Sequence, residues 1–267
     1  MICCKRLGLV CALTFLPAFA QDRTEARGER QFGRIHDLVE HFDGTAESTN
    51  WSGYAVLGSS FTSAEGSWVV PAVNCSGVRG DQYAAFWVGL DGYSSSTVEQ
   101  TGTFSDCAGR TPVYSAWYEF YPAGSMNISS VPIKPGDIMS ASVVYIGSNK
   151  FTVTITDETT GKSFSKTSTV SGASRSSAEW IAEAPCCTFS GGILPLSDFG
   201  TVLFGEDSTG VSGTNYATDS TVSGPISSFG SANVVNITKI GSSTSPQTST
   251  CSALSSDGTS FSCTWAN

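Results

Sequence analysis

Short apolar runs that alternate with Ser, Thr and Gly recur from Trp51 to the C-terminus, and this pattern constrains the fold more than any other feature. Alternation with a period of two is typical of strands that bury one face. Turn-forming clusters such as Asn74–Gly80 and Pro135–Asp137 separate the runs at short intervals. No long segment has the period of an amphipathic helix. The pattern predicts many antiparallel strands folded as a sandwich or a barrel.

The predicted strands occupy most of the chain after Asn50. They lie at Tyr54–Val56, Ser67–Val70, Ala85–Val88, Ser115–Tyr121, Ile138–Tyr145, Phe151–Ile155, Ala178–Ala182 and Thr201–Phe204. A two-sheet architecture of this length commonly forms one domain. We therefore expect residues 50–267 to be a single all-β domain.

Residues 1–20 have the features of a secretory signal peptide. Lys5 and Arg6 precede the apolar run Leu7–Phe19, and Ala18 and Ala20 supply small residues for cleavage. The run is shorter than the roughly 20 apolar residues of a transmembrane helix, and no later stretch reaches that length. We expect a secreted, extracellular protein that is not anchored in a membrane.

Residues 21–49 differ in composition from the rest of the chain. They contain four arginines, seven acidic residues and both histidines of the protein, His36 and His41. Such a segment can be a disordered tail, a propeptide that covers an acidic domain until processing, or both. We expect a propeptide that ends near Asn50. If either histidine matters, we expect it to act in pH-triggered release of this segment.

Six cysteines remain after the signal peptide, and an even number in an exported chain favours disulfides. Spacing alone does not determine their pairing, although the short separation of Cys251 and Cys263 suits a hairpin. Cys186 and Cys187 are adjacent and remain ambiguous. No C-x-x-C spacing occurs and no histidine lies near these cysteines, so we expect no metal site and no cofactor.

The predicted domain is acidic. Residues 51–267 contain eight basic and sixteen acidic residues, a formal charge of −8. This charge argues against nucleic acid or an anionic membrane as a partner, and we expect a monomer. At low pH the carboxylates become neutral and few charged groups remain, so self-repulsion in acid is modest.

The domain after Asn50 contains no histidine, and this excludes most familiar hydrolase sites. A Ser-His-Asp or Cys-His site needs an imidazole base, and a zinc peptidase needs H-E-x-x-H. The domain also has no G-x-S-x-G elbow, P-loop or G-x-G-x-x-G motif. Chemistry here must use carboxyl and amide side chains.

Three segments carry a more specific signal, and two further pieces accompany them. The sequence F-W-V-G-L-D-G begins at Phe86 and leads to V-E-Q-T-G at Val98; A-W-Y-E-F-Y follows at Ala116, and A-E-W-I-A-E at Ala178. Two shorter motifs accompany these segments: N-W-S-G-Y at Asn50 precedes them, and D-F-G at Asp198 follows them. Together these motifs resemble the glutamic peptidases, also called eqolisins, over Asn50 to Asn267.

The resemblance implies a sandwich of two large antiparallel sheets, of the concanavalin-like or jelly-roll type. It also implies an endopeptidase that cleaves protein or peptide substrates at acidic pH. By motif, Gln100 and Glu179 are the catalytic pair. The implied substrate-cleft residues are Trp51, Trp87, Asp91 and Tyr118, with Asp106 near another cleft aspartate but shifted by an insertion.

The residue types explain such a reaction. Water attacking a peptide bond needs a base, the developing oxyanion needs a donor, and the leaving nitrogen needs an acid. A glutamate can serve as base and then as acid, and a glutamine amide is a neutral donor at any pH. Glu183 shares a strand face with Glu179 but lies roughly 13 Å along the strand, so Glu179 must find its partner on another strand.

Several assignments stay open at this stage. Glu119 is either a cleft hydrogen-bonding group or a buried, paired carboxylate. Trp68, Trp117, Trp180 and Trp265 are predicted to be core residues. Two other functions use the same residue types: a glycoside hydrolase with Glu119 and Glu179 as its carboxyl pair, and a non-catalytic carbohydrate-binding module with an aromatic face.

Overall fold

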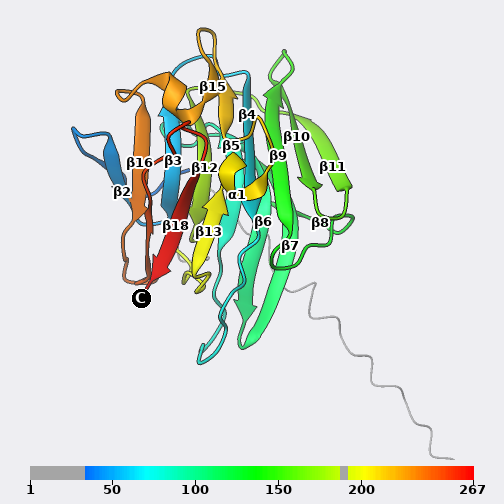
Figure 1. The fold of residues 1–267 in the computed structure, drawn as a ribbon, viewed down its shortest axis with the longest axis vertical. Coiled ribbons are helices and arrows are strands. Elements are labelled where there is room, and N and C mark those ends of the chain that lie inside the picture. The colour runs from blue at the N-terminus through cyan, green and yellow to red at the C-terminus, as the bar shows by residue number, and fades with distance from the viewer. Residues whose placement is uncertain (1–33, 187–191) are drawn as a thin grey trace, which may run out of the picture.

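The computed structural model describes residues 34–186 and 192–267, which form eighteen strands in two layers (Figure 1). The first sheet is antiparallel except where β2 and β16 pair in parallel. Across it, the strands are β1 (Val39–Glu40), β2 (Thr45–Ser48), β16 (Val234–Lys239), β3 (Trp51–Leu57), β12 (Ser177–Glu183), β5 (Ala85–Leu90), β6 (Val98–Ala108), β7 (Thr111–Tyr121) and β8 (Met126–Ile128).

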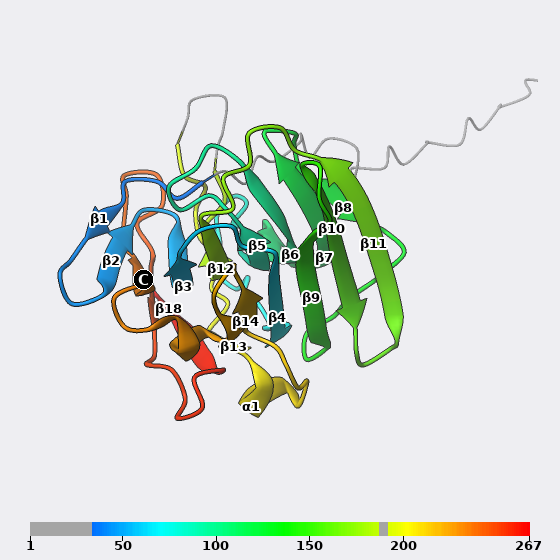
Figure 2. The same ribbon diagram turned by 90° about the horizontal axis from the view of Figure 1, so that it is seen from above.

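The second sheet lies over the first (Figure 2). Its strands are, in order, β17 (Thr248–Cys251), β18 (Phe261–Ala266), β13 (Thr201–Phe204), β4 (Ser63–Val69), β9 (Ile138–Tyr145), β10 (Lys150–Asp157) and β11 (Lys162–Thr169). β14 (Tyr216–Thr218) pairs with β4 and with β15 (Ser223–Pro225). The two short helical turns are α1 (Glu206–Thr209) and the 3₁₀ turn Ile226–Phe229. The sheets join where β17 meets β16.

The first sheet buries both of its faces. Along β12, Ala178, Trp180 and Ala182 face the second sheet and belong to the main apolar core between the layers. Ile181 faces the opposite way, into a second apolar cluster that includes Trp87. Alternate residues of one strand therefore serve two clusters, as the period of a strand requires. The all-β sandwich predicted from the sequence is confirmed, and so are the predicted strands.

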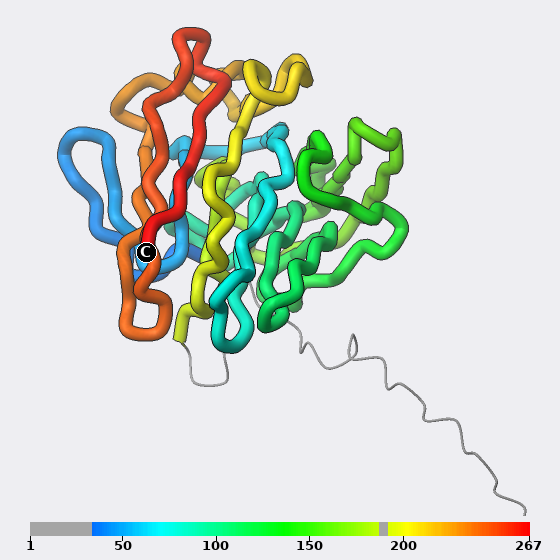
Figure 3. Tube along the Cα trace, turned by 60° about the horizontal axis from the view of Figure 1, so that its bottom comes forward, coloured from blue at the N-terminus to red at the C-terminus, as the bar shows by residue number. Residues whose placement is uncertain are grey.

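Residues 34–49 fold against the rest of the protein and are not a disordered tail. β2 pairs in parallel with β16, so this early segment lies beside a strand from near the C-terminus (Figure 3). The first 33 residues, with the predicted signal peptide, lie outside the described part of the chain. Among the residues that are described, no helix is long and apolar enough to cross a membrane.

Two disulfides connect strands or their ends. Cys251 and Cys263 are directly paired across β17 and β18, which confirms the hairpin pairing suggested by their spacing. Cys75 and Cys107 link the loop after β4 to the end of β6. Cys186 is also disulfide-bonded, while Cys187 lies outside the described residues. No group of three or more potential metal ligands occurs among the described residues.

Candidate active site

Four residues form a row across four neighbouring strands of the first sheet. Glu179 on β12 pairs with Gly89 on β5, Gly89 pairs with Gln100 on β6, and Gln100 pairs with Glu119 on β7. Directly paired residues lie on the same face of a sheet. All four therefore lie on the face away from the second sheet, and two strand spacings separate the Cα atoms of Glu179 and Gln100 by roughly 10 Å.

Gly89 lies between Glu179 and Gln100 in the row, and its missing side chain leaves room for the ring of Trp87. A Cβ atom at this position would lie 2.8 Å from the ring of Trp87 and 3.2 Å from Cβ of Gln100. Any side chain here would displace one of these neighbours. The glycine thus lets a long carboxyl side chain and a long amide side chain approach each other from its two sides.

The environment of Glu179 favours its neutral form. The side chain is fully buried, and neither carboxyl oxygen has a hydrogen-bond partner among the described residues. Burial raises the pKa of Glu179 well above its ordinary value, and the negative charge of Asp91 raises it further. The nearby Ser177 hydroxyl opposes this shift without making a hydrogen bond of normal geometry.

Gln100 and Glu119 are joined by a short hydrogen bond. Nε2 of Gln100 donates to Oε2 of Glu119 over 2.7 Å, and both side chains are fully buried. The sequence left Glu119 as either a cleft hydrogen-bonding group or a buried, paired carboxylate. In the structure Glu119 is buried and hydrogen-bonded, and it lies on the same face as Glu179.

Trp51, Trp87 and Glu183 lie together on the same face, further along the strands. The two indole rings make an edge contact with centroids 5.0 Å apart. Glu183 accepts hydrogen bonds from Nε1 of Trp87 at 2.9 Å and from Nδ2 of Asn50 at 3.1 Å. Burial raises the pKa of Glu183 to about 8, although these hydrogen bonds oppose the shift. The shared face of Glu179 and Glu183 is as the strand period predicts.

Asp91 holds a turn instead of facing open space. It follows β5 with a φ of 67°, and its carboxylate accepts hydrogen bonds from the backbone N–H groups of Arg175 at 2.7 Å and Ser176 at 2.9 Å. Those residues lie just before β12. Asp91 thus positions the strand that carries Glu179, and its charge acts on that carboxyl group.

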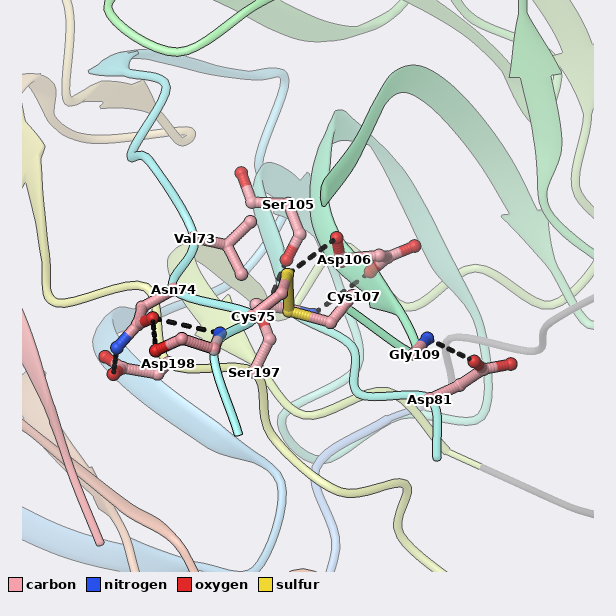
Figure 4. The surroundings of a disulfide bond; sticks show 12 residues. Val73, Asn74, Cys75, Asp81, Ser105, Asp106, Cys107, Gly109, Ser197 and Asp198 are labelled. Atoms are coloured by element: carbon pink, nitrogen blue, oxygen red, sulfur yellow. Dashed lines mark hydrogen bonds between the residues drawn. A yellow bond between two sulfur atoms is a disulfide. The ribbon is translucent and has the colours of Figure 1, made fainter. Parts of the chain in front are cut away.

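Two other predicted cleft residues do not join the row. Asp106 is six residues beyond Gln100 on β6, roughly 20 Å away, where it accepts a hydrogen bond from the Ala84 N–H beside the Cys75–Cys107 disulfide (Figure 4). Tyr118 alternates with Glu119 along β7, so it faces the second sheet and stacks on Phe164 at 5.4 Å. The structure does not bring either side chain to Glu179 and Gln100.

The predicted core tryptophans fall into two groups. Trp68 and Trp180 lie in the core between the sheets, and Trp265 is partly buried against it. Trp117 is buried as predicted, but it lies on the face of Gln100 and stacks on Phe104 at 5.2 Å. Its position two residues before Glu119 is the sequence signal that would have placed both on one face.

Sequence reasoning did not identify Gly89, Asn50 or Glu99 as site residues. Gly89 lies within a motif, but its role depends on which strands neighbour it. Glu99 is buried on the opposite face from Gln100, and both carboxyl oxygens lack a partner among the described residues. Burial and the nearby Asp91 raise the pKa of Glu99 to about 9.

Residues 34–37 cover one end of the site. Ile35 is buried in the apolar cluster of Trp51 and Trp87, and its N–H donates to the Gly92 carbonyl at 3.1 Å. Asn50 connects this segment to Glu183, because its side chain also accepts from the His36 N–H at 2.8 Å. These contacts place residues 34–37 beside the two tryptophans.

Sequence comparison finds similar proteins over most of the chain. The sequence model of the peptidase A4 family matches residues 49–265. Aspergillopepsin-2 from Aspergillus niger is 32% identical over 235 residues, which cover 74% of this chain and 82% of that protein. Scytalidopepsin B from Scytalidium lignicola is 35% identical over 170 residues, covering 61% of this chain and 62% of its own.

Structure comparison finds the same group of proteins. Scytalido-glutamic peptidase with a transition state analog inhibitor has a TM-score of 0.65 at 26% identity, with 82% of this chain and 98% of that chain covered. Aspergilloglutamic peptidase from Aspergillus niger has a TM-score of 0.55 at 26% identity, with 69% and 99% covered.

Proposed function

Since this chain belongs to the peptidase A4 family and is a glutamic endopeptidase, we propose that Glu179 and Gln100 are its catalytic pair. The observation that carries the proposal is the row in which Glu179 and Gln100 flank Gly89 on one face of the sheet. A carboxyl group and an amide on one face, with no side chain at the position between them, suit the activation of a water molecule and the binding of a peptide carbonyl.

The proposed reaction needs only these two side chains. Ionised Glu179 takes a proton from water while the water oxygen attacks the peptide carbonyl carbon. The electrons of the carbonyl bond move to its oxygen, and the Gln100 amide donates a hydrogen bond to that oxyanion. The oxyanion electrons then re-form the carbonyl bond as the carbon–nitrogen bond breaks, and Glu179 gives its proton to the leaving nitrogen. This transfer leaves Glu179 ionised, as it was at the start.

Acidic working conditions follow from the two roles of Glu179. The carboxyl group must lose its proton to act as a base and hold a proton to act as an acid. In the covered site, burial keeps it protonated. Opening of the cleft admits water and lowers the pKa of Glu179 toward the acidic range, so we infer that activity is greatest in acid.

Trp51, Trp87, Glu119 and Glu183 are the proposed cleft residues, because they share the face of the catalytic pair. The indole rings offer apolar contact area to substrate side chains. Asp91 is assigned to holding the turn before β12, while Asp106 and Tyr118 are not part of the proposed cleft.

The N-terminal region completes the proposal. We infer that residues 1–20 direct secretion and that residues 21–49 are a propeptide. The contacts of residues 34–37 with the cleft tryptophans support this, because the segment occupies space that substrate needs. Release of the segment would expose the domain that begins near Asn50.

The substrate class can be tested with the secreted full chain after acidification. We expect cleavage of casein at acidic pH, no turnover of polysaccharide, and loss of casein cleavage in Gln100→Ala. Removing a donor of this kind typically lowers the rate by about 10² to 10³. Polysaccharide turnover, or a Gln100→Ala variant as active as the wild type, would refute the proposed pair.

A further inference from the structure

Glu119 contacts the side chain that the proposed reaction uses as oxyanion donor. Its carboxylate lies directly across from Gln100 in the sheet and accepts the Gln100 Nε2–H over 2.7 Å. We propose that Glu119 is a positioning residue that fixes the orientation of the Gln100 amide. This inference rests on the catalytic role proposed for Gln100.

A glutamine amide needs such a partner because its two ends have nearly the same shape. Rotation by half a turn exchanges the carbonyl oxygen with the NH₂ group. In one orientation the amide donates to an oxyanion, and in the other its oxygen repels the oxyanion. A carboxyl oxygen that accepts from NH₂ would repel the amide oxygen, so the contact of Glu119 Oε2 with Gln100 Nε2 favours the donating orientation. An NH₂ group has two protons, and donation to Glu119 uses one of them.

The surroundings make this selection effective. Gln100 and Glu119 are both fully buried, and a hydrogen bond is stronger where water is excluded. Their strands are neighbours with eleven paired positions, Val98↔Tyr121 to Ala108↔Thr111, so the relative position of the two backbones is well fixed. The stacked rings of Phe104 and Trp117 further hold β6 against β7 on the same face.

The effects of Glu119→Gln on kcat and on KM distinguish a positioning role of Glu119 from a direct catalytic role. Glu119→Gln keeps the size and an accepting oxygen but no longer distinguishes the two amide orientations. We expect kcat of the processed enzyme to fall by about 10- to 100-fold, less than complete loss of the donor, with KM changed by no more than about twofold. Glu158→Gln, the same change at an exposed turn, should leave both constants unchanged.

A double-mutant cycle with Gln100→Ala tests the coupling itself. If Glu119 acts through Gln100, Glu119→Gln lowers kcat in the wild type but causes no further loss in Gln100→Ala. Equal losses in both backgrounds would overturn the inference, because they would mean that Glu119 acts independently. If Glu119→Gln does not fold, Glu119→Asp, which keeps the carboxyl group but shortens the side chain, gives the same comparison. Full activity in Gln100→Ala alone would instead refute the proposed function.

Discussion

The distance between Glu179 and Gln100 depends on a residue with no side chain. Gly89 pairs with both in the sheet, and a Cβ there would lie 2.8 Å from the Trp87 ring. Trp87 in turn donates to Glu183, so a displaced indole would move a second cleft carboxyl group. The packing at this single position thus connects both ends of the proposed cleft.

Gly89→Ala should therefore impair catalysis more than folding. We expect kcat/KM to fall by about 100-fold, because small displacements of reacting groups cost that much. Gly66→Ala is the matched control, since its Cβ would meet Trp180 and Val88 in the core between the sheets at 3.0 and 3.1 Å. The control should lower the melting temperature and leave kcat/KM intact. A Gly89→Ala enzyme with wild-type kcat/KM would contradict the role assigned to Gly89.

Sequence reasoning predicted part of this site because strand period is local. It placed Glu179 and Glu183 on one face, and the motifs identified Gln100. It misplaced Tyr118, although the same period puts Tyr118 and Glu119 on opposite faces. The pairing of Gln100 with Glu119 depends on strand neighbours and register, which a single sequence does not reveal.

At the scale of elements, the segment 34–49 is an added edge of the sheet. β2 pairs in parallel with β16, and Ile35 is buried in the apolar cluster that includes Trp51 and Trp87. The composition of the segment predicted a propeptide that precedes the domain, whereas residues 34–49 pair with the sheet. Its parallel pairing with a strand almost 200 residues later was not predictable, because no local pattern encodes a long-range parallel contact.

His36 should make attachment of this segment sensitive to acid. Burial lowers the pKa of His36, with Arg34 acting in the same direction and Asp37 opposing. A lowered pKa means that the docked segment takes up a proton less readily than the released one. Its attachment is fully stable above about pH 6.5 and weakens as the pH falls through the lowered value. His36→Gln should therefore slow acid-triggered processing, followed by intact mass of the chain.

His41→Gln is the control, because His41 is exposed in the same segment. It should be processed at the wild-type rate at each pH. Equal processing of the His36→Gln variant and wild type across this range would show that the histidine has no part in release.

At the scale of the whole molecule, buried carboxyl groups set the pH range of stability. Burial raises the pKa of Glu99 to about 9 and that of Glu183 to about 8, from a usual value of 4.5. The folded protein therefore holds protons that the unfolded chain loses above about pH 4.5. Stability from these groups is complete in acid and declines as the pH rises toward these values.

Glu99→Gln should reduce this decline, because an amide cannot ionise. We expect the wild type to melt at a higher temperature at pH 4 than at pH 8, and the difference to shrink in Glu99→Gln. Glu158→Gln, at an exposed turn, should keep the wild-type difference. A wild-type melting temperature that does not fall between these pH values would contradict the assignment of buried, protonated glutamates.

The overall architecture was the most predictable property of the molecule. Alternating apolar and polar residues determine which face of each strand is buried, and the predicted strands at Ile138–Tyr145 and Thr201–Phe204 match the structure at both ends. The burial of both faces of β5 and β12 was harder to predict. An apolar run such as Phe86–Val88 indicates a buried strand, but it does not show that the two faces pack into different apolar clusters.

The central claim is that Glu179 carries the proton transfers of peptide hydrolysis. The most direct measurement is kcat for a defined peptide at acidic pH with Glu179→Gln and Glu183→Gln side by side. Both residues are buried glutamates on one face of β12, so folding effects of the two changes are comparable. We predict that kcat of Glu179→Gln falls by about 10⁴-fold or more, while Glu183→Gln retains most of the wild-type kcat. Cleavage by Glu179→Gln at the rate of Glu183→Gln would contradict the account.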